Sequence, residues 1–394
     1  MARQPTTTDV VVQGGGMVGL AAATALAGRG LAVTVLDHQP PSTWQGGAYR
    51  LQVTSLNRAS EASLDALGAW SRLPQWRATP VRRIEATDRH DGPLVAFDVA
   101  EMGESHLAHI VENEMLVAGL AEAAERAGVR WRRPATVADW SDNGDALDLL
   151  LDDRTRLGAR LLVGADGAGS PVRALTGITT ETGDYGQAGV VTVVQGRRPH
   201  GGIARQRFLP GGPLAFLPLG EDQAAIVWSR PEAEAERLLG LETADFRNEL
   251  AAAAGDWLGG VEAVGERARF PLRWLRARNY VCQRVALVGD AAHVIHPLAG
   301  QGANLGIADA AELARAVGDA VDRGRDPGDW LALRRYERGR REANETMQWL
   351  MNAFHWGFDG DAPALRGIRR AAFGITGRAT PLRRAFMAHA MGWR

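Results

Sequence analysis

Three glycines, Gly14, Gly16 and Gly19, stand between two apolar stretches in the segment DVVVQGGGMVGLAAATALAGRGLAVTVLD. The valines before the glycines and the apolar residues that end the segment have the composition of strands, and the alanine-rich stretch between them that of a helix. Glycine at position 14 permits a tight turn, Gly16 lets a pyrophosphate approach the backbone, and Gly19 lets helix and strand pack closely. The pattern therefore predicts a βαβ unit whose helix N-terminus faces the phosphates of a dinucleotide.

Asp37 closes this segment, at the distance expected for an acid that accepts hydrogen bonds from an adenosine ribose. Glycine is frequent in the chain, with 47 residues, so a glycine-rich turn without a ligand is the alternative. The strand, the helix and the terminal acid make the glycine pattern specific. This unit alone leaves NAD and FAD open as the dinucleotide.

A second motif, LLVGADGAGSPVR, combines an apolar strand with a glycine-rich turn. The strand should end at Gly164 and the chain should turn through Asp166. Ser170 is a helix-capping residue type, and Pro171 is favoured at the first helical position. The segment predicts a turn that leads into a short helix, and taken alone it also fits an ordinary strand-to-helix connection.

A third motif, RVALVGDAAHVIHPLAGQGANLGIADAAELARAV, repeats the order of strand, turn, loop and helix. The turn falls at Gly289 and Asp290, where the carboxylate is placed to hold a sugar-like hydroxyl. A loop over 297–302 precedes the expected helix. The backbone N–H groups of Ala303 and Asn304 would open that helix at its positive end, a favourable position for the anionic pyrimidine end of a reduced flavin.

Together these motifs resemble the flavoprotein aromatic hydroxylases of the para-hydroxybenzoate hydroxylase fold, in particular the ubiquinone-biosynthesis hydroxylases. The resemblance extends through HIVENEML (109–116), RFLPGGPLAFLPL (207–219) and RFPLRW (269–274), so it covers most of the chain. It implies an α/β fold in which a Rossmann-like FAD domain is interleaved with an antiparallel β-sheet substrate domain and followed by C-terminal helices.

The resemblance also implies bound FAD, with NAD(P)H as the electron donor. Arg50 matches an arginine that reaches the FAD phosphates, although it also fits a solvated surface residue, and Asn113 fits either an FAD contact or a helix cap. Asp166 matches an acid that serves FAD and the nicotinamide donor, Asp290 the ligand of the ribityl chain. Ala303 replaces the family's frequent leucine. The residues assigned to the cofactor are Gly14, Gly16, Gly19, Asp37, Arg50, Asn113, Asp166, Gly289, Asp290, Pro297, Gly300, Gly302, Ala303 and Asn304.

The elements between these motifs alternate apolar and polar residues around 81–97 and 189–228, which predicts an antiparallel sheet. Such a sheet would form a lid over the flavin, and we place the substrate beneath it. Apolar lid residues such as Leu214, Phe216, Leu217 and Trp228 would exclude water or form plain sheet core. Helical composition returns over 309–325 and 330–354. The expected division is an FAD domain of residues 1–75, 101–180 and 275–330, a sheet of 76–100 and 181–274, and a helical segment of 331–394.

Composition and charge limit the possible binding partners and the cellular compartment of the protein. A formal net charge of −1 argues against nucleic acid as a partner, and the single cysteine, Cys282, fits a reducing compartment. Residues 1–8 lack a signal-peptide core and no stretch approaches a membrane span, so we expect a cytoplasmic protein. The nine histidines show no metal-site spacing. His293 is interpreted as a structural residue rather than a proton shuttle, His296 fits either a role in the pocket or none, and no catalytic side chain is assigned.

The expected function is that of an FAD-dependent monooxygenase that uses O2 to hydroxylate a hydrophobic aromatic substrate, a (poly)prenylated phenol or quinone precursor in ubiquinone biosynthesis. Alternatives are a natural-product hydroxylase or epoxidase, and a non-oxygenating FAD reductase or scaffold subunit. Seven arginines and no acid follow Asp361, among scattered apolar residues. This composition suits peripheral contact with the inner membrane or a biosynthetic complex, and equally packing of the apolar residues on the FAD domain.

Overall fold

The structure is a computed structural model that describes residues 6–40, 43–88, 93–296, 300–358 and 391–392. Its first layer is a sheet in the order β17-β18-β11-β1-β2-β8, extended through β11 by β10 and β9. The strands from β18 to β8 are mutually parallel. The sheet consists of β1 (Thr6–Gln13), β2 (Val33–Leu36), β8 (Arg130–Arg132), β9 (Val137–Asp142), β10 (Leu147–Leu151), β11 (Arg156–Gly164), β17 (Val281–Cys282) and β18 (Val285–Leu287).

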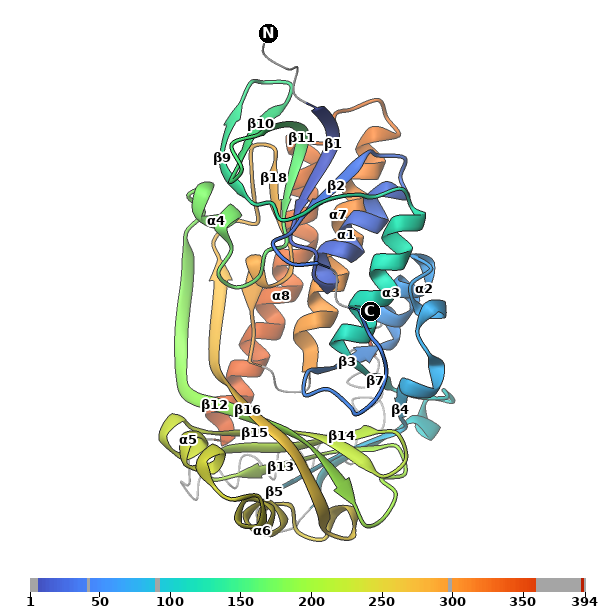
Figure 1. Ribbon diagram of the computed structural model, residues 1–394, viewed down its shortest axis with the longest axis vertical. Helices are drawn as coiled ribbons and strands as arrows, with labels where there is room; N and C mark the ends of the chain where they lie inside the picture. Colours follow the sequence, from blue (N-terminus) through green and yellow to red (C-terminus); the bar gives the residue numbers. More distant parts are fainter. Residues whose placement is uncertain (1–5, 41–42, 89–92, 297–299, 359–390, 393–394) are drawn as a thin grey trace.

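Helices cover this parallel sheet, as Figure 1 shows. Central strands such as β1 and β11 carry uninterrupted apolar runs, the composition expected where both faces of a strand are covered. Val10 to Val12 and Leu161 to Val163 are accordingly inaccessible to solvent. The helices of this part are α1 (Met17–Ala27), α3 (Asn113–Arg126), α4 (Pro171–Leu175), α7 (Gln301–Val321) and α8 (Trp330–Phe358). α7 begins at Gln301, slightly before the predicted start.

A second sheet has the order β19-β16-β12-β15-β14-β13-β5-β6. Its two longest strands, β12 and β16, run from the first layer along one side of the molecule into this sheet (Figure 1). The sheet consists of β5 (Arg83–Asp88), β6 (Pro93–Asp98), β12 (Thr180–Gly196), β13 (Ile203–Leu209), β14 (Gly212–Leu219), β15 (Gln223–Pro231), β16 (Val261–Ala277) and β19 (His293–Val294).

One pair in this sheet differs from the predicted antiparallel arrangement, because β5 and β13 run parallel. Antiparallel neighbours can be joined by a short turn, whereas parallel strands need a long crossover. The chain between β5 and β13 passes through α3, β11 and α4 before it returns. Because this connection is long, β13 can run parallel to β5, and the sheet is mixed at this position.

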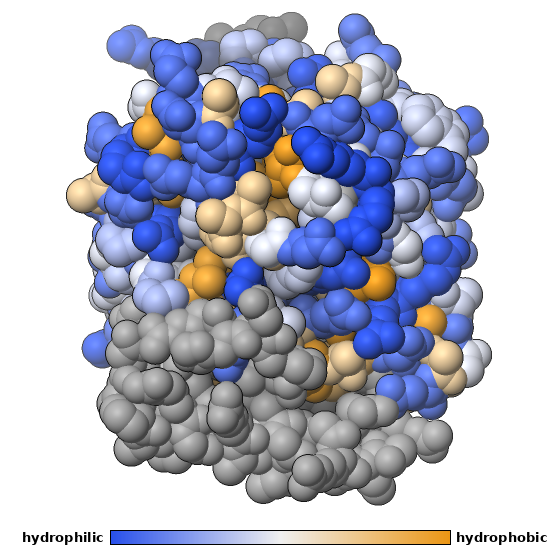
Figure 2. All heavy atoms as spheres, turned by 90° about the horizontal axis from the view of Figure 1, so that it is seen from below, coloured by the Kyte–Doolittle hydropathy of each residue, from blue (hydrophilic) through white to orange (hydrophobic). Residues whose placement is uncertain are grey.

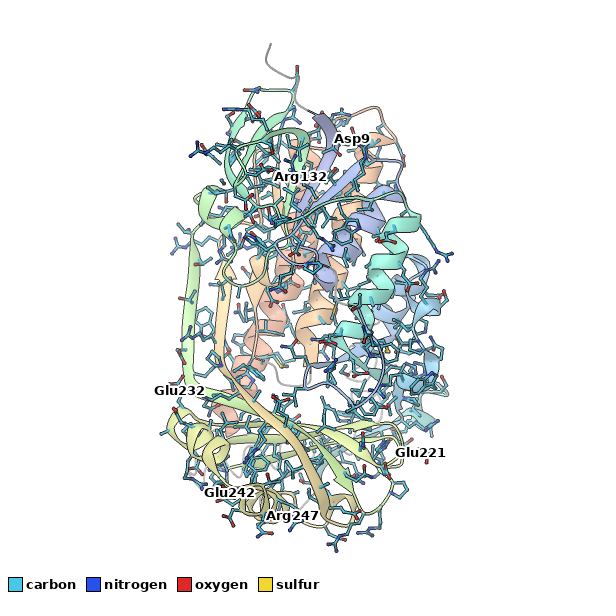
Figure 3. All side chains as sticks on the ribbon, viewed as in Figure 1. Asp9, Arg132, Glu221, Glu232, Glu242 and Arg247 are labelled. Atoms are coloured by element: carbon cyan, nitrogen blue, oxygen red, sulfur yellow. The ribbon has the colours of Figure 1, made fainter. Side chains whose placement is uncertain are left out.

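Two helices, α5 (Glu232–Gly240) and α6 (Thr243–Ala254), pack beneath the second sheet. Leu214, Phe216 and Trp228 form a buried core with Phe246 and Leu250 on this side. Seen from below, the described surface is mainly hydrophilic with scattered hydrophobic groups (Figure 2). Glu232, Glu242 and Arg247, which Figure 3 labels, lie at the outer edge of the part of the molecule that contains α5 and α6.

A small third sheet has the order β3-β7-β4 and lies on the side opposite β12 and β16 (Figure 1). β3 pairs with β7 and β7 with β4 in antiparallel register. α2 follows β3 directly, and the side chain of Asn57 accepts a hydrogen bond from the Ser60 N–H at its first turn. The elements are β3 (Val53–Asn57), β4 (Thr79–Val81), β7 (Ala108–Glu112) and α2 (Arg58–Ala66).

Candidate active site

The carboxyl ends of four parallel strands meet at one edge of the first sheet. β1, β2, β11 and β18 end in the segments that carry Gly14, Asp37, Asp166 and Asp290, respectively. Ligands of open α/β sheets bind outside the carboxyl ends of the strands. The three sequence motifs, separated by more than a hundred residues, therefore converge on one binding edge.

The first glycine loop leaves room for a ligand at one of its three predicted positions. Gly14 has a φ of +109°, and a Cβ there would lie 2.3 Å from the carbonyl oxygen of Ala165. A Cβ at Gly19 would lie 1.9 Å from the Gly14 oxygen. At Gly16, by contrast, a Cβ would meet nothing within 4 Å. Gly14 and Gly19 thus permit tight backbone packing, and Gly16 faces open space.

Gly16 is also the N-cap of α1, and no side chain caps that helix. The first N–H groups of a helix have no intrahelical acceptor and carry partial positive charge. An anion placed over Gly16 would satisfy them. The loop accordingly fits the pyrophosphate of FAD.

Asp37 lies next to this loop and accepts hydrogen bonds from the N–H groups of Gly15, at 2.5 Å, and Gln39, at 2.8 Å. A Cβ at Gly15 would lie 3.0 Å from the ring of Trp131, over which Arg133 stacks at 3.4 Å. The indole and guanidinium thus border the carboxylate that we assign to the ribose. The sequence analysis missed both residues, because β8 joins the site only through pairing with β2.

The carboxylate of Asp166 is hydrogen-bonded within its own turn. Its carboxylate accepts from the Ser170 hydroxyl at 2.5 Å and from the Val172 N–H at 2.9 Å. Burial raises the pKa of Asp166, although these hydrogen bonds act in the opposite direction. Ser170 caps α4 by accepting from the Arg173 N–H, which confirms the predicted cap.

Arg173 connects the second motif to the third, a contact that the sequence did not reveal. Its guanidinium donates to the carbonyl oxygen of Ala291 at 2.9 Å and to that of Ala168 at 2.6 Å. Ala291 follows Asp290 directly. Arg173 therefore fixes the Asp166 turn against the Asp290 turn.

Asp290 is accessible to solvent although dense protein surrounds it. Its side chain is exposed, yet burial raises the pKa of its carboxyl group. Gly289, with a φ of +59°, makes the preceding turn and donates its N–H to Asp309. An accessible carboxylate amid dense protein is suited to a ligand hydroxyl.

Asp309 anchors this turn from behind and is completely buried. It accepts hydrogen bonds from His293 Nε2 at 2.5 Å and from Arg340 Nε at 2.7 Å. Burial opposes its ionisation, but His293 and Arg340 outweigh burial and lower the pKa of Asp309 to about 2. His293 is thereby positioned as a structural residue, as interpreted from the sequence.

The N-terminus of α7 is a second helix start that no side chain of the described residues caps. Gly300 is its N-cap with a φ of +62°, and a Cβ at Gly302 would meet none of the described atoms within 4 Å. The Asn304 side chain donates to the Ser55 carbonyl at 2.7 Å and accepts from the Asn57 N–H at 2.9 Å. Its side chain thus ties α7 to β3 beside the open space at Gly302. Pro297 lies outside the described residues.

Arg50 and Asn113 lie next to each other in space. Arg50 Nε is 3.2 Å from the Glu114 carboxylate, and the backbone N–H of Arg50 donates to the Glu112 carboxylate. The Asn113 amide oxygen accepts from the Thr54 hydroxyl at 2.6 Å. Glu112 is the N-cap of α3, so Asn113 begins the helix rather than capping it. The Arg50 side chain is largely exposed, and Glu114 is its ion-pair partner in this structure.

A pocket of about 420 Å³ lies where the second and third sheets face the start of α7. His296, Gly300 and Asn113 are among the residues that line it. The second sheet contributes mainly small or apolar side chains together with the polar Arg205, Gln206, Ser229 and Arg269, and the third sheet contributes apolar ones and Ser55. These wall residues include Val53, Val81, Ala108, Ile110, Val191, Ala204, Ala215, Leu217, Val227 and Ala268.

Strand β14 shows which predicted lid residues face this pocket. Ala215 and Leu217 line it, whereas Leu214 and Phe216 point to the α5–α6 core because successive side chains alternate. Trp228 also belongs to that core. Among the predicted lid residues, Leu217 thus contacts the pocket and the other three form sheet core.

Comparison with known proteins identifies the arrangement. Residues 7–349 match the family model described as FAD binding domain. The chain is 36% identical over 385 residues to the ubiquinone hydroxylase UbiL of Rhodospirillum rubrum, covering 98% of this chain and 89% of the relative. It is 36% identical over 394 residues to the 3-demethoxyubiquinol 3-hydroxylase of Escherichia coli, covering all of both chains.

The fold is shared with a solved monooxygenase structure. The p-nitrophenol 4-monooxygenase PnpA of Pseudomonas putida superimposes with a TM-score of 0.79 at 21% identity, covering 99% of each chain. Its layers match the interleaved α/β and sheet arrangement that the sequence predicted. Among the described helices, none combines the length and apolar character that crossing a membrane requires.

Proposed function

The chain belongs to the ubiquinone-biosynthesis hydroxylase family of FAD-dependent aromatic hydroxylases, and from that premise we propose that it hydroxylates the ring of a prenylated phenol or quinol. The chain is an FAD-dependent monooxygenase of this class. The names of its relatives supply the substrate class, a ubiquinone precursor. The observation that carries the proposal is the mainly apolar pocket beside the N-terminus of α7, whose polar lining includes Arg205 and Arg269.

The walls of this pocket suit a flat, hydrophobic ring. Ala204, Ala215 and Ala268 leave space above the second sheet, and Ile110 closes the opposite side. A volume of about 420 Å³ falls near the lower end of the range of about 300–1,000 Å³ for small-molecule sites. A substituted ring fits such a volume, and a long prenyl chain would continue outside it.

We assign the cofactor-binding residues by the space and polarity that each offers. The N–H groups over Gly16 would hold the FAD pyrophosphate, Asp37 the adenosine ribose, and Asp290 the ribityl chain. The N-terminus of α7 at Gly302 and Ala303 would face the pyrimidine end of the flavin ring. Asp166, which is bonded within its own turn, would act by holding that turn in place.

When bound, FAD reduced by NAD(P)H supplies the activation of O2 that adds one oxygen atom to the ring. The chain contributes orientation and exclusion of water. Leu217 and Val191 cover the substrate from the second sheet and Ile110 from the third. An apolar enclosure limits the access of water to the reacting atoms, which favours oxygen transfer over unproductive release of hydrogen peroxide.

An oxygen electrode tests this proposal with a demethoxyubiquinol analogue that carries one or two prenyl units. We expect consumption of NAD(P)H and O2 to rise on addition of the analogue, with a matching amount of hydroxylated product. A saturated isoprenoid alcohol of similar size serves as the control and should stimulate neither. Oxidation of NAD(P)H with no consumption of O2 would overturn the proposal. Formation of hydrogen peroxide with no hydroxylated product would overturn it as well.

For a membrane-derived substrate we further propose peripheral contact through the arginine-rich stretch that follows Asp361, which lies outside the described residues. Each arginine near an anionic surface contributes about 1 kcal/mol. Flotation with anionic liposomes should capture the protein in low salt and fail for the double variant Arg383→Ala/Arg384→Ala. The matched double variant Arg323→Ala/Arg325→Ala, at exposed positions after α7, should float like the wild type. Flotation that is indifferent to salt and to both variants contradicts this contact.

A further inference from the structure

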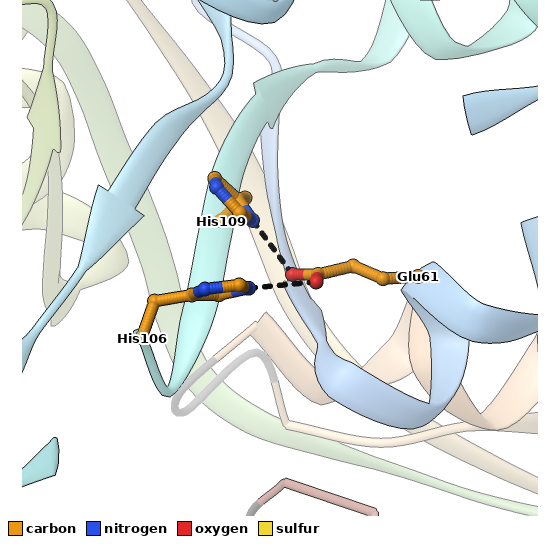
Figure 4. Close-up of side chains that lie close together, drawn as sticks. All are labelled: Glu61, His106 and His109. Atoms are coloured by element: carbon orange, nitrogen blue, oxygen red, sulfur yellow. Dashed lines mark hydrogen bonds and ion pairs between the residues drawn. The ribbon is translucent and has the colours of Figure 1, made fainter. Parts of the chain in front are cut away.

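Three side chains with metal-binding donor atoms converge behind the β3-β7-β4 sheet (Figure 4). Glu61 projects from α2, His109 from β7, and His106 from the segment just before β7. Glu61 Oε2 lies 2.8 Å from His106 Nε2, and Glu61 Oε1 lies 2.8 Å from His109 Nδ1. One donor atom from each of the three residues lies within 4.8 Å of the others.

We propose that Glu61, His106 and His109 form a binding site for a divalent transition-metal ion, with Zn²⁺ as the matching ion. Two imidazole nitrogens and a carboxylate are a donor set that Zn²⁺ prefers, with bonds of about 2.0–2.2 Å. Ligand atoms at such distances are about 3.3–3.6 Å apart at the tetrahedral angle that Zn²⁺ adopts. Each imidazole lies 2.8 Å from a different oxygen of Glu61, and the three donors lie within 4.8 Å of one another, so side-chain shifts on the order of 1 Å would bring them to these separations.

The surroundings orient these ligands. The other ring nitrogen of His106, Nδ1, lies 2.8 Å from the Ser105 hydroxyl, the kind of outer contact that fixes a ligating imidazole. The ring of His109 contacts that of Trp70, with centroids 5.3 Å apart. The side chains of Glu61, His106 and His109 are 8%, 10% and 15% exposed. The donors are therefore largely shielded from water yet reachable from the surface.

Arg58 is the group that opposes a cation here. Its Nη1 lies 3.0 Å from His106 Nε2 and 3.7 Å from Glu61 Oε2. Its Nη2 lies 3.3 Å from Glu104, a partner toward which the guanidinium can turn when an ion enters. Arg58 should consequently weaken metal binding, and its removal should strengthen it.

The alternation of β7 indicates a structural role for the ion. Ala108 and Ile110 line the substrate pocket, whereas His109 between them faces α2. The metal site and the pocket thus lie on opposite faces of one strand. A bound ion would fasten α2 to the back of the pocket wall without touching the reacting atoms, so the inference is independent of the proposed substrate.

Calorimetric titration of the FAD-loaded protein with ZnCl2, after treatment with EDTA and dialysis, tests the site. We expect one equivalent to bind and to raise the melting temperature, because the ion binds the folded chain. His109→Gln keeps a donor for Glu61 but removes the imidazole, and it should weaken binding at least tenfold, as should Glu61→Gln. Arg58→Met should tighten binding, and His38→Gln, at an exposed histidine remote in the fold, should leave it unchanged.

Flavin absorbance reports whether each variant is folded and loaded. If the Glu61 variant loses FAD, the His109 and Arg58 variants decide the matter. Absence of stoichiometric binding to the wild type would overturn the proposal. Binding that His109→Gln leaves as tight as in the wild type would overturn it equally, because the ion would then be held elsewhere.

Discussion

Gly302 is a residue at which stability and cofactor affinity should change in opposite directions. It lies in the first turn of α7 without a positive φ, and a Cβ there would meet nothing within 4 Å. Gly302→Ala should therefore stabilise the apoprotein by about 0.4–1 kcal/mol, since alanine restricts the unfolded chain. The same methyl group enters the space that we assign to the flavin ring. We expect FAD affinity to fall about tenfold or more, equivalent to about 1.4 kcal/mol.

Two measurements separate these effects. Urea unfolding of the apoprotein gives the free energy of unfolding, and titration of flavin fluorescence gives the Kd of FAD. Gly240→Ala is the matched control, because Gly240 ends α5 in equally open space and far along the fold from the cofactor edge. It should leave the Kd unchanged. If Gly302→Ala binds FAD as tightly as the wild type, the start of α7 does not face the flavin and the assignment is refuted.

Three further predictions concern the buried anchor, the ribityl ligand and the pocket. Arg340→Met leaves the buried Asp309 without its guanidinium partner and should lower the free energy of unfolding, measured in urea, by about 3–5 kcal/mol. The pKa of Asp309 is lowered from 3.8 to about 2, so the stability that its ionised form contributes is present above about pH 4 and lost as the pH falls toward 2. If the free energy of unfolding of the wild type, measured over this pH range, shows no such loss, the prediction is contradicted. Asp290→Ala should weaken FAD binding ten- to hundredfold, the loss of a charge-assisted hydrogen bond of about 1.5–3 kcal/mol, and an unchanged Kd in a folded variant would place the carboxylate elsewhere. Ala215→Leu should raise KM for the aromatic substrate without changing FAD affinity, whereas Leu214→Ala should cost about 2–5 kcal/mol of stability and spare KM; equal effects on KM would refute the assigned sides of β14.

The sequence predicted best what a few neighbouring residues decide. The tight turn at Gly14, the close packing at Gly19 and the cap at Ser170 each follow from local backbone requirements. The motifs also placed the loops at the carboxyl ends of the strands. The fold class followed from the family resemblance that those motifs carry, and the shared fold confirms it.

Long-range contacts and the sides of covered strands were not predicted. The contact of Arg173 with Ala291 and that of Glu61 with His106 join residues far apart in sequence, so no spacing rule reveals them. Strand β14 is covered on both faces, by the pocket wall and by the α5–α6 core, and a mostly apolar strand does not indicate which face is which. Pairing of β13 with β5 likewise depends on the crossover and not on either strand.

Turnover under ¹⁸O2 tests the central claim, that this chain inserts one atom of O2 into an aromatic ring, most directly. Purified FAD-loaded protein would be incubated with NAD(P)H and a short-chain demethoxyubiquinol analogue. The mass of the product would then be measured by mass spectrometry. We predict one ¹⁸O atom in the ring of each product molecule and none when the label is in the water instead. Product without ¹⁸O, or a product reduced in its prenyl double bonds with O2 untouched, would contradict the account.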